Sequence, residues 1–170
     1  MAWEGAGGAV IRCPPAPHAR DHTSTLHERG IAMRERILHG LIGAAALLSL
    51  GHHLDHVIRG NQVGWPLIPD VTPFTYSLGI YPLLLLGLFL YRAGRAGPGC
   101  WMALSGGGAL FVGALHFGPA AVETPADIIG AYAAPIVGRF AFGWLVALVA
   151  LLVGTFLYEA TLWSRRRRGG

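Results

Sequence analysis

Four long apolar stretches, almost free of charged side chains, are the feature of this sequence that most limits its fold. Each is close to the ~20 residues that a helix needs to cross the hydrocarbon core of a bilayer. Charged residues make up 13% of the chain and hydrophobic ones 53%, whereas soluble domains carry about 25% charged residues. The sequence therefore predicts an all-α polytopic membrane protein, a bundle of four transmembrane helices, with spans over about residues 37–56, 73–91, 99–117 and 140–158.

The segments outside these spans have a different composition. Residues 1–32 are rich in Gly, Ala, Pro, Arg and His without an apolar period, which predicts a disordered N-terminal tail. Met33 directly precedes a charged run and the first span, so we consider it an alternative start of the protein. The four-helix membrane domain is expected over residues 33–164, followed by a basic cytoplasmic tail over residues 165–170.

Prolines mark two further local features. Pro82 lies in the middle of the second span, where the loss of a backbone N–H predicts a kink. In the third loop, Thr124-Pro125-Ala126-Asp127 resembles a helix start, with Thr124 as the cap and Asp127 in the capping-box position. We therefore expect a short interfacial helix over about residues 125–133.

The distribution of arginine predicts the orientation in the membrane. With four spans, one side of the bilayer carries most of the arginines near the spans, namely Arg29, Arg34, Arg36, Arg92, Arg95 and Arg165 to Arg168. Arg59 and Arg139 fall on the other side. The positive-inside rule then places both termini in the cytoplasm of a multi-pass protein of the plasma membrane.

The third span carries small residues at a spacing of four, Ser105, Ala109 and Gly113, with further glycines at positions 106 to 108. Small residues on one row allow two membrane helices to approach closely. This helix is therefore expected to be central in the bundle. The same face is the predicted contact for a homo- or hetero-oligomer.

The end of the first span concentrates ligand-type side chains: His52, His53, Asp55 and His56. On a helix, His52 and His56 are neighbours at i and i+4 and can hold one metal ion between them. His116, at a similar depth on the third span, is expected to supply a ligand from a second helix. We assign Asp55 to orienting an imidazole, and His53 to the role of a spare ligand or proton shuttle.

Two cofactors fit this set of side chains. Imidazoles with a carboxylate suit a transition metal ion such as Zn, Fe or Cu, and zinc sites use three or four protein ligands. Glu123 and Asp127, from the third loop, are further candidates for the carboxylate. Alternatively, one histidine of the first span and His116 can ligate a single haem from both sides.

Two functions without a cofactor compete with these. In a scaffold or assembly subunit, the histidines would only cap and anchor helices, since a helix C-terminus favours positive charge, and Arg59 would pair with Asp55. A small transporter would need a polar row through the bilayer. Between Leu41 and Leu50 the first span offers only Ser49, so this hypothesis is weaker.

Other classes lack their sequence signatures. The net charge of +4 comes from arginines beside apolar segments, whereas nucleic-acid binding requires a basic face on a soluble domain. Cys13 and Cys100 form no CxxC pair, and the motifs GxSxG, HExxH and the Walker loop are absent from the sequence. No particular reaction follows, and the sequence leaves open whether the protein is an enzyme.

Overall fold

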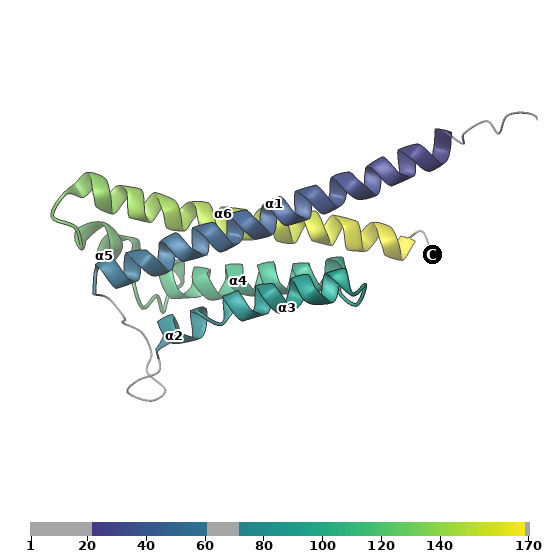
Figure 1. Ribbon diagram of the computed structural model, residues 1–170. Coiled ribbons are helices and arrows are strands. Elements are labelled where there is room, and N and C mark those ends of the chain that lie inside the picture. Colours follow the sequence, from purple (N-terminus) through teal and green to yellow (C-terminus); the bar gives the residue numbers. More distant parts are fainter. Residues whose placement is uncertain (1–21, 61–71, 169–170) are drawn as a thin grey trace, which may run out of the picture. The chain divides into compact units, whose positions relative to one another are not determined.

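The computed structural model describes residues 22–60 and 72–168, and in these ranges every regular element is a helix (Figure 1). The helices, in chain order, are α1 (His22–Ile58), α2 (Pro73–Ser77), α3 (Ile80–Arg92), α4 (Pro98–Phe117), α5 (Pro125–Gly130) and α6 (Pro135–Arg168). Four stretches are long and apolar enough to cross a membrane: Ala32–Ile58, Pro73–Arg92, Pro98–Phe117 and Pro135–Arg168. The predicted all-α polytopic bundle is thereby confirmed.

The chain divides into two units, Met1–Arg36 and Ile37–Gly170. In the first unit, the expected tail over residues 1–32 is described only from His22, where α1 begins, so residues 22–32 are helical. Residues 1–21 lie outside the described part. At the other end, α6 continues through the basic segment as far as Arg168. The second unit contains all the features discussed below.

Pro82 breaks the helix of the second span, and the break lies about one turn before Pro82 itself. The span consists of α2 and α3, separated by a turn at Leu78 and Gly79. Pro82 has no N–H to donate to the carbonyl of Leu78, and its ring crowds that carbonyl. The helix therefore breaks there, and Pro82 occupies the first turn of α3. This break brings the end of α2 beside the histidine-rich end of α1, as the contacts of His53 show below.

Helix α4 packs mainly against α6, and small residues of α4 face large ones of α6. Gly106 lies against the ring of Phe156, and Gly108 against the side chain of Leu152. The close approach that the small residues predicted is therefore present, with α6 as the partner inside the same chain. Self-association through Ser105, Ala109 and Gly113 stays a prediction.

The last two turns of α1 are fixed against α6 by one tryptophan. The indole of Trp144 lies so close to Gly51 that a Cβ at position 51 would overlap it. The indole Nε1 donates a hydrogen bond to the backbone carbonyl of Leu48, at 2.8 Å. A glycine at position 51 is thus required for this contact, which sets the position of the adjacent His52.

The predicted short helix in the third loop is α5, which begins with the expected capping box. The backbone N–H of Thr124 donates to Asp127 Oδ2 at 2.7 Å, and the N–H of Asp127 donates to Thr124 Oγ1 at 3.4 Å. Helix α5 packs on the start of α6, where Gly138 lies directly against the backbone of Ile129. This contact holds the loop that carries Glu123 against the bundle.

We expect Gly138→Ala to destabilise the protein by about 1–3 kcal/mol, because the new methyl group would collide with the carbonyl of Ile129. Backbone atoms move less easily than side chains, so α5 would have to shift. Gly143→Ala is the matched control on the same helix, since nothing lies within 4 Å of a Cβ there. Thermal unfolding of both variants in detergent checks this; equal melting temperatures would contradict the contact.

A candidate metal centre

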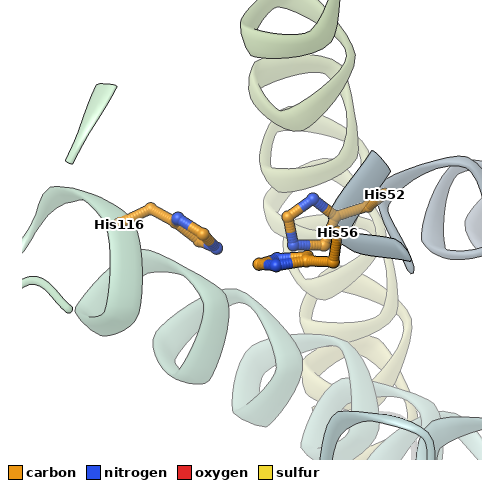
Figure 2. Close-up of side chains that lie close together, drawn as sticks. All are labelled: His52, His56 and His116. Atoms are coloured by element: carbon orange, nitrogen blue, oxygen red, sulfur yellow. The ribbon is translucent and has the colours of Figure 1, made fainter. Parts of the chain in front are cut away.

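Three buried histidines converge at one end of the bundle. His52 and His56 lie one turn apart on α1, and His116 lies at the end of α4, with its ring directed toward the other two (Figure 2). The ring centroid of His52 is 4.7 Å from that of His56 and 5.1 Å from that of His116. One ring nitrogen from each residue lies within 4.8 Å of the other two. This arrangement of imidazoles can hold a metal ion.

The backbone after α4 determines the orientation of the His116 ring. The chain turns back after Phe117, and the N–H groups of Val122 and Glu123 both donate to the carbonyl of Leu115. This turn brings the carbonyl oxygen of Glu123 to 3.0 Å from His116 Nδ1. Because a carbonyl oxygen can only accept, Nδ1 carries the proton and the lone pair lies on Nε2. Histidines that bind metals commonly have their second ring nitrogen fixed in this way.

The Glu123 carboxylate lies beside His56 and His116. Its Oε2 atom is 3.7 Å from His56 Nε2 and 3.7 Å from His116 Nδ1, and its side chain is 5% exposed. From the sequence, Asp55 was expected to orient an imidazole, and Glu123 was a loop candidate for the carboxylate. In the structure, Glu123 is the carboxylate next to His56 and His116, because the turn after α4 carries it back over the ends of both helices.

Asp55 belongs to a neighbouring ionic network centred on Arg59. Arg59 donates to Asp55 Oδ2 through Nε at 2.9 Å and through a terminal nitrogen at 2.7 Å. It also donates to both carboxylate oxygens of Glu123. The predicted pair of Arg59 and Asp55 is therefore present, with Glu123 as its third member. This network links the end of α1 to the loop after α4.

The network carries a net charge of −1, because one guanidinium faces two carboxylates. The side chain of Arg59 is 2% exposed and that of Glu123 is 5% exposed. Burial alone would lower the pKa of Arg59, but its hydrogen bonds to the Glu123 and Asp55 carboxylates outweigh burial and raise the pKa, so the guanidinium stays charged. The remaining negative charge next to the histidines favours a cation at the centre of the cluster.

Tyr132, in the turn between α5 and α6, donates a hydrogen bond to Asp55 Oδ1. Burial, together with this bond to the carboxylate, raises the pKa of Tyr132 to about 12. The folded protein therefore favours the neutral phenol of Tyr132 over the phenolate. The stabilisation from this hydrogen bond is complete below pH ~10, the pKa of an unperturbed tyrosine. It is lost as the pH rises through about 12.

We therefore expect Tyr132 to ionise near pH 12 in the native protein and at a lower pH in an Asp55→Asn variant, where the acceptor charge is gone and only the effect of burial remains. The absorbance of tyrosinate at alkaline pH measures this. Subtracting the titration of Tyr132→Phe isolates the signal of this one residue. An unchanged midpoint in Asp55→Asn would show that the carboxylate does not control the phenol.

His53 lies apart from the other three histidines in the structure, and its role as a spare ligand or proton shuttle stays a prediction. Its ring faces α2 and α3, where Nδ1 lies 2.7 Å from Tyr81 Oη and Nε2 lies 2.7 Å from Ser77 Oγ. Ser77 Oγ donates its own proton to the carbonyl of Phe74, so it accepts from Nε2, and Tyr81 donates to Nδ1. Both ring nitrogens of His53 are therefore hydrogen-bonded. The ring faces α2 and α3 because His53 lies ~100° around the helix from His52.

Asp127 is also outside the cluster. Its carboxylate accepts from the backbone and the hydroxyl of Thr124, and these hydrogen bonds lower its pKa. The side chain is exposed, and its role is to cap α5. Of the carboxylates proposed from the sequence, Glu123 is the one that lies within 4 Å of the histidine rings.

Comparisons with protein-family models, with characterised proteins and with solved structures found no match to this chain. The function is therefore inferred from the geometry of the site.

Proposed function

We propose that this protein is an integral membrane protein that binds one transition metal ion through His52, His56 and His116. The observation that carries the proposal is the convergence of three buried imidazoles, each offering a nitrogen within 4.8 Å of the others. The fixed tautomer of His116 and the adjacent negative charge support it. Imidazole ligands beside a carboxylate suit Zn, Fe or Cu.

To bind an ion, the donor nitrogens would have to come closer together than they lie in this structure. In a tetrahedral zinc site with Zn–N distances of 2.0–2.1 Å, neighbouring nitrogens are ~3.3 Å apart. The nitrogens of the three histidines lie within 4.8 Å of one another, so metal binding requires them to approach by up to about 1.5 Å. Glu123 Oε2 is close enough to complete the site or to accept a proton from a bound water. Three imidazoles and a free fourth position also occur in catalytic zinc sites, but no reaction is assigned here.

The same geometry favours an ion over a haem. A haem with two histidine ligands places them on opposite faces of the porphyrin. Here the third imidazole lies within 4.8 Å of both others, in the space that the porphyrin ring would need. The scaffold hypothesis explains Asp55 and Arg59, which form an ion pair at the helix end. It gives no reason for His52, His56 and His116 to be buried together.

We propose that both termini lie in the cytoplasm and the metal centre lies toward the extracytoplasmic face of the plasma membrane; the arginines, most of which lie on the side of the termini, support this orientation. Labelling of single cysteines introduced at exposed positions of intact cells tests this. Reaction of a cysteine at position 60, at the histidine end, with an impermeant reagent is expected. Reaction of a cysteine at position 94, in the connection between α3 and α4, would instead show that the protein has the opposite orientation.

Elemental analysis of the protein purified in mild detergent, together with its absorption spectrum, tests the proposed function. We expect about one equivalent of Zn, Fe or Cu per chain and no Soret band. A Soret band would show that the bound cofactor is a haem and not a single metal ion. Absence of metal, both as purified and after incubation with Zn²⁺ or Cu²⁺ followed by desalting, would contradict the proposal and favour the scaffold.

A further inference from the structure

A cavity of about 340 Å³ extends from the three histidines into the bundle between α1, α3, α4 and α6. His52, His56 and His116 line one end of it, together with Glu123. This volume falls within the range of sites that bind small molecules, ~300–1,000 Å³. The cavity therefore has room for an organic molecule beside a metal ion at the histidines.

Away from the histidines, the wall of the cavity is mostly apolar, and two of its hydroxyl groups are already engaged. Ser105 Oγ donates to the carbonyl of Trp101 at 2.7 Å, and Thr155 Oγ1 donates to the carbonyl of Leu151 at 2.8 Å. Their protons are therefore used within their own helices. An apolar wall with polar groups gathered at one end suits a lipid-soluble molecule with a polar head group.

The histidine nitrogens at the polar end are free to interact with such a head group. Among the described residues, neither ring nitrogen of His52 nor Nε2 of His116 has a hydrogen-bond partner. In the same part of the chain, Trp101 Nε1 is the one side-chain nitrogen or oxygen that is fully enclosed without a hydrogen bond. The unpartnered nitrogens of the two histidines are therefore not enclosed, and both residues line the cavity. A metal ion held by these nitrogens can be reached from the cavity.

The cavity is open toward the side of the bundle. Ala103, Gly107 and Phe111 follow one another at a spacing of four on α4, and all three line the cavity although they are exposed. Leu83 of α3 lines it as well and is 47% exposed. These residues belong to the segments that are long and apolar enough to cross a membrane, so the opening meets lipid and not water.

The affinity for a molecule from the bilayer must come mainly from its head group. An alkyl chain gains little by moving from lipid into an apolar cavity, because lipid tails are as apolar as the wall. A hydroxyl group suits the polar end, since its oxygen can bind the ion and its proton can be donated to Glu123 Oε2, which lies 3.7 Å from His56 Nε2. A carboxylate head group suits it less, because the network of Arg59, Asp55 and Glu123 already carries a negative charge.

We infer that the metal centre takes a lipid-soluble alcohol from the bilayer as its further ligand. The alcohol enters between α3 and α4, and its hydroxyl group lies at the histidines with the alkyl chain in the cavity. This inference rests on the proposed metal site and adds the class of the ligand and its route. Trp144 contacts Gly51, beside His52, and Leu152 lies about two turns further along α6, ~12 Å at 1.5 Å per residue. The far end of the chain is therefore expected near Leu152, which lines the cavity.

Photolabelling of the zinc-loaded protein in nanodiscs tests this inference. The probe is a decanol derivative with a diazirine at the end of the chain remote from the hydroxyl, and the matched probe carries hydrogen in place of the hydroxyl. We expect mass spectrometry to find adducts of the alcohol at Leu148 and Leu152, which are buried and line the cavity. These adducts should be lost with the hydrocarbon probe and in protein stripped of metal with EDTA. Both probes should label Leu110, which is 77% exposed.

Gly107→Leu and Gly143→Leu test the route of entry. Both positions are exposed helix sites with open space around a Cβ, but only Gly107 lines the cavity. We expect Gly107→Leu to lose the adducts at Leu148 and Leu152 while it retains its zinc, because the new side chain fills the opening. Gly143→Leu should retain both the adducts and the zinc. Unchanged adducts in Gly107→Leu would overturn the route between α3 and α4.

The zinc content separates failure of this inference from failure of the metal site. Zinc-loaded protein with adducts only at exposed residues, or with equal labelling of Leu152 by both probes, would overturn the inference and leave the metal site intact. Equal labelling of zinc-loaded and stripped protein by the alcohol would do the same. Protein that binds no metal in elemental analysis would contradict the proposed function, and the inference would fail with it.

Discussion

Replacing His116 with alanine is expected to lower the affinity for the metal ion by at least about 100-fold. Loss of a residue that merely supports a ligand typically costs 10- to 100-fold, and His116 is proposed as a ligand itself. It is also the member that joins α4 to the two histidines of α1. Competition of the purified protein with a chelator of known affinity measures the effect.

His53→Ala is the matched control, since His53 is also buried but has both ring nitrogens hydrogen-bonded to other groups. We expect its metal affinity to stay within a few-fold of the native value. A His116→Gln variant, which retains a polar side chain, guards against misfolding as the cause of the loss. Equal affinities for His53→Ala and both His116 variants would rule out the proposed ligand set.

Replacing Arg59 with methionine is expected to destabilise the protein by about 3–5 kcal/mol, because two carboxylates would be left without their shared cation. The side chains of Arg59 and Glu123 are 2% and 5% exposed, so water does not compensate for the loss. The effect should appear as a lower melting temperature in detergent. Arg139→Met, at an exposed position of α6, should have a small effect.

The triple variant Arg59→Met, Asp55→Asn, Glu123→Gln distinguishes loss of charge balance from loss of packing. Because it removes both uncompensated carboxylates, we expect it to recover much of the stability that Arg59→Met loses. If the triple variant is as unstable as the single one, the ionic network does not explain the effect. A native melting temperature for Arg59→Met would contradict the network itself.

The sequence predicts the membrane fold well because the signal is local. Each span shows itself by length and lack of charge, and the caps at Thr124 and the break caused by Pro82 depend on neighbours within four residues. The pairing of His52 with His56 is equally local, since helix geometry fixes a spacing of four. His116 was associated with them by depth alone, and the structure brings its ring to 5.1 Å from His52.

The carboxylate and the surrounding network depend on contacts between distant segments. Glu123 reaches the histidines because the chain reverses after α4, and Arg59 reaches Glu123 across 64 positions. Tyr132 bonds to Asp55 across 77 positions. No periodicity or spacing in the sequence encodes these contacts. The contacts of His53 with Ser77 and Tyr81, on α2 and α3, likewise join segments that are distant in the sequence.

X-ray absorption spectroscopy of the metal-loaded protein tests the central claim most directly, since it counts the imidazoles around the ion. We predict scattering from three imidazole rings in the native protein and from two in His116→Ala, with metal–nitrogen distances near 2.0–2.1 Å if the ion is zinc. A bound metal without imidazole scattering, or one whose spectrum is the same in His116→Ala, would contradict the proposed site.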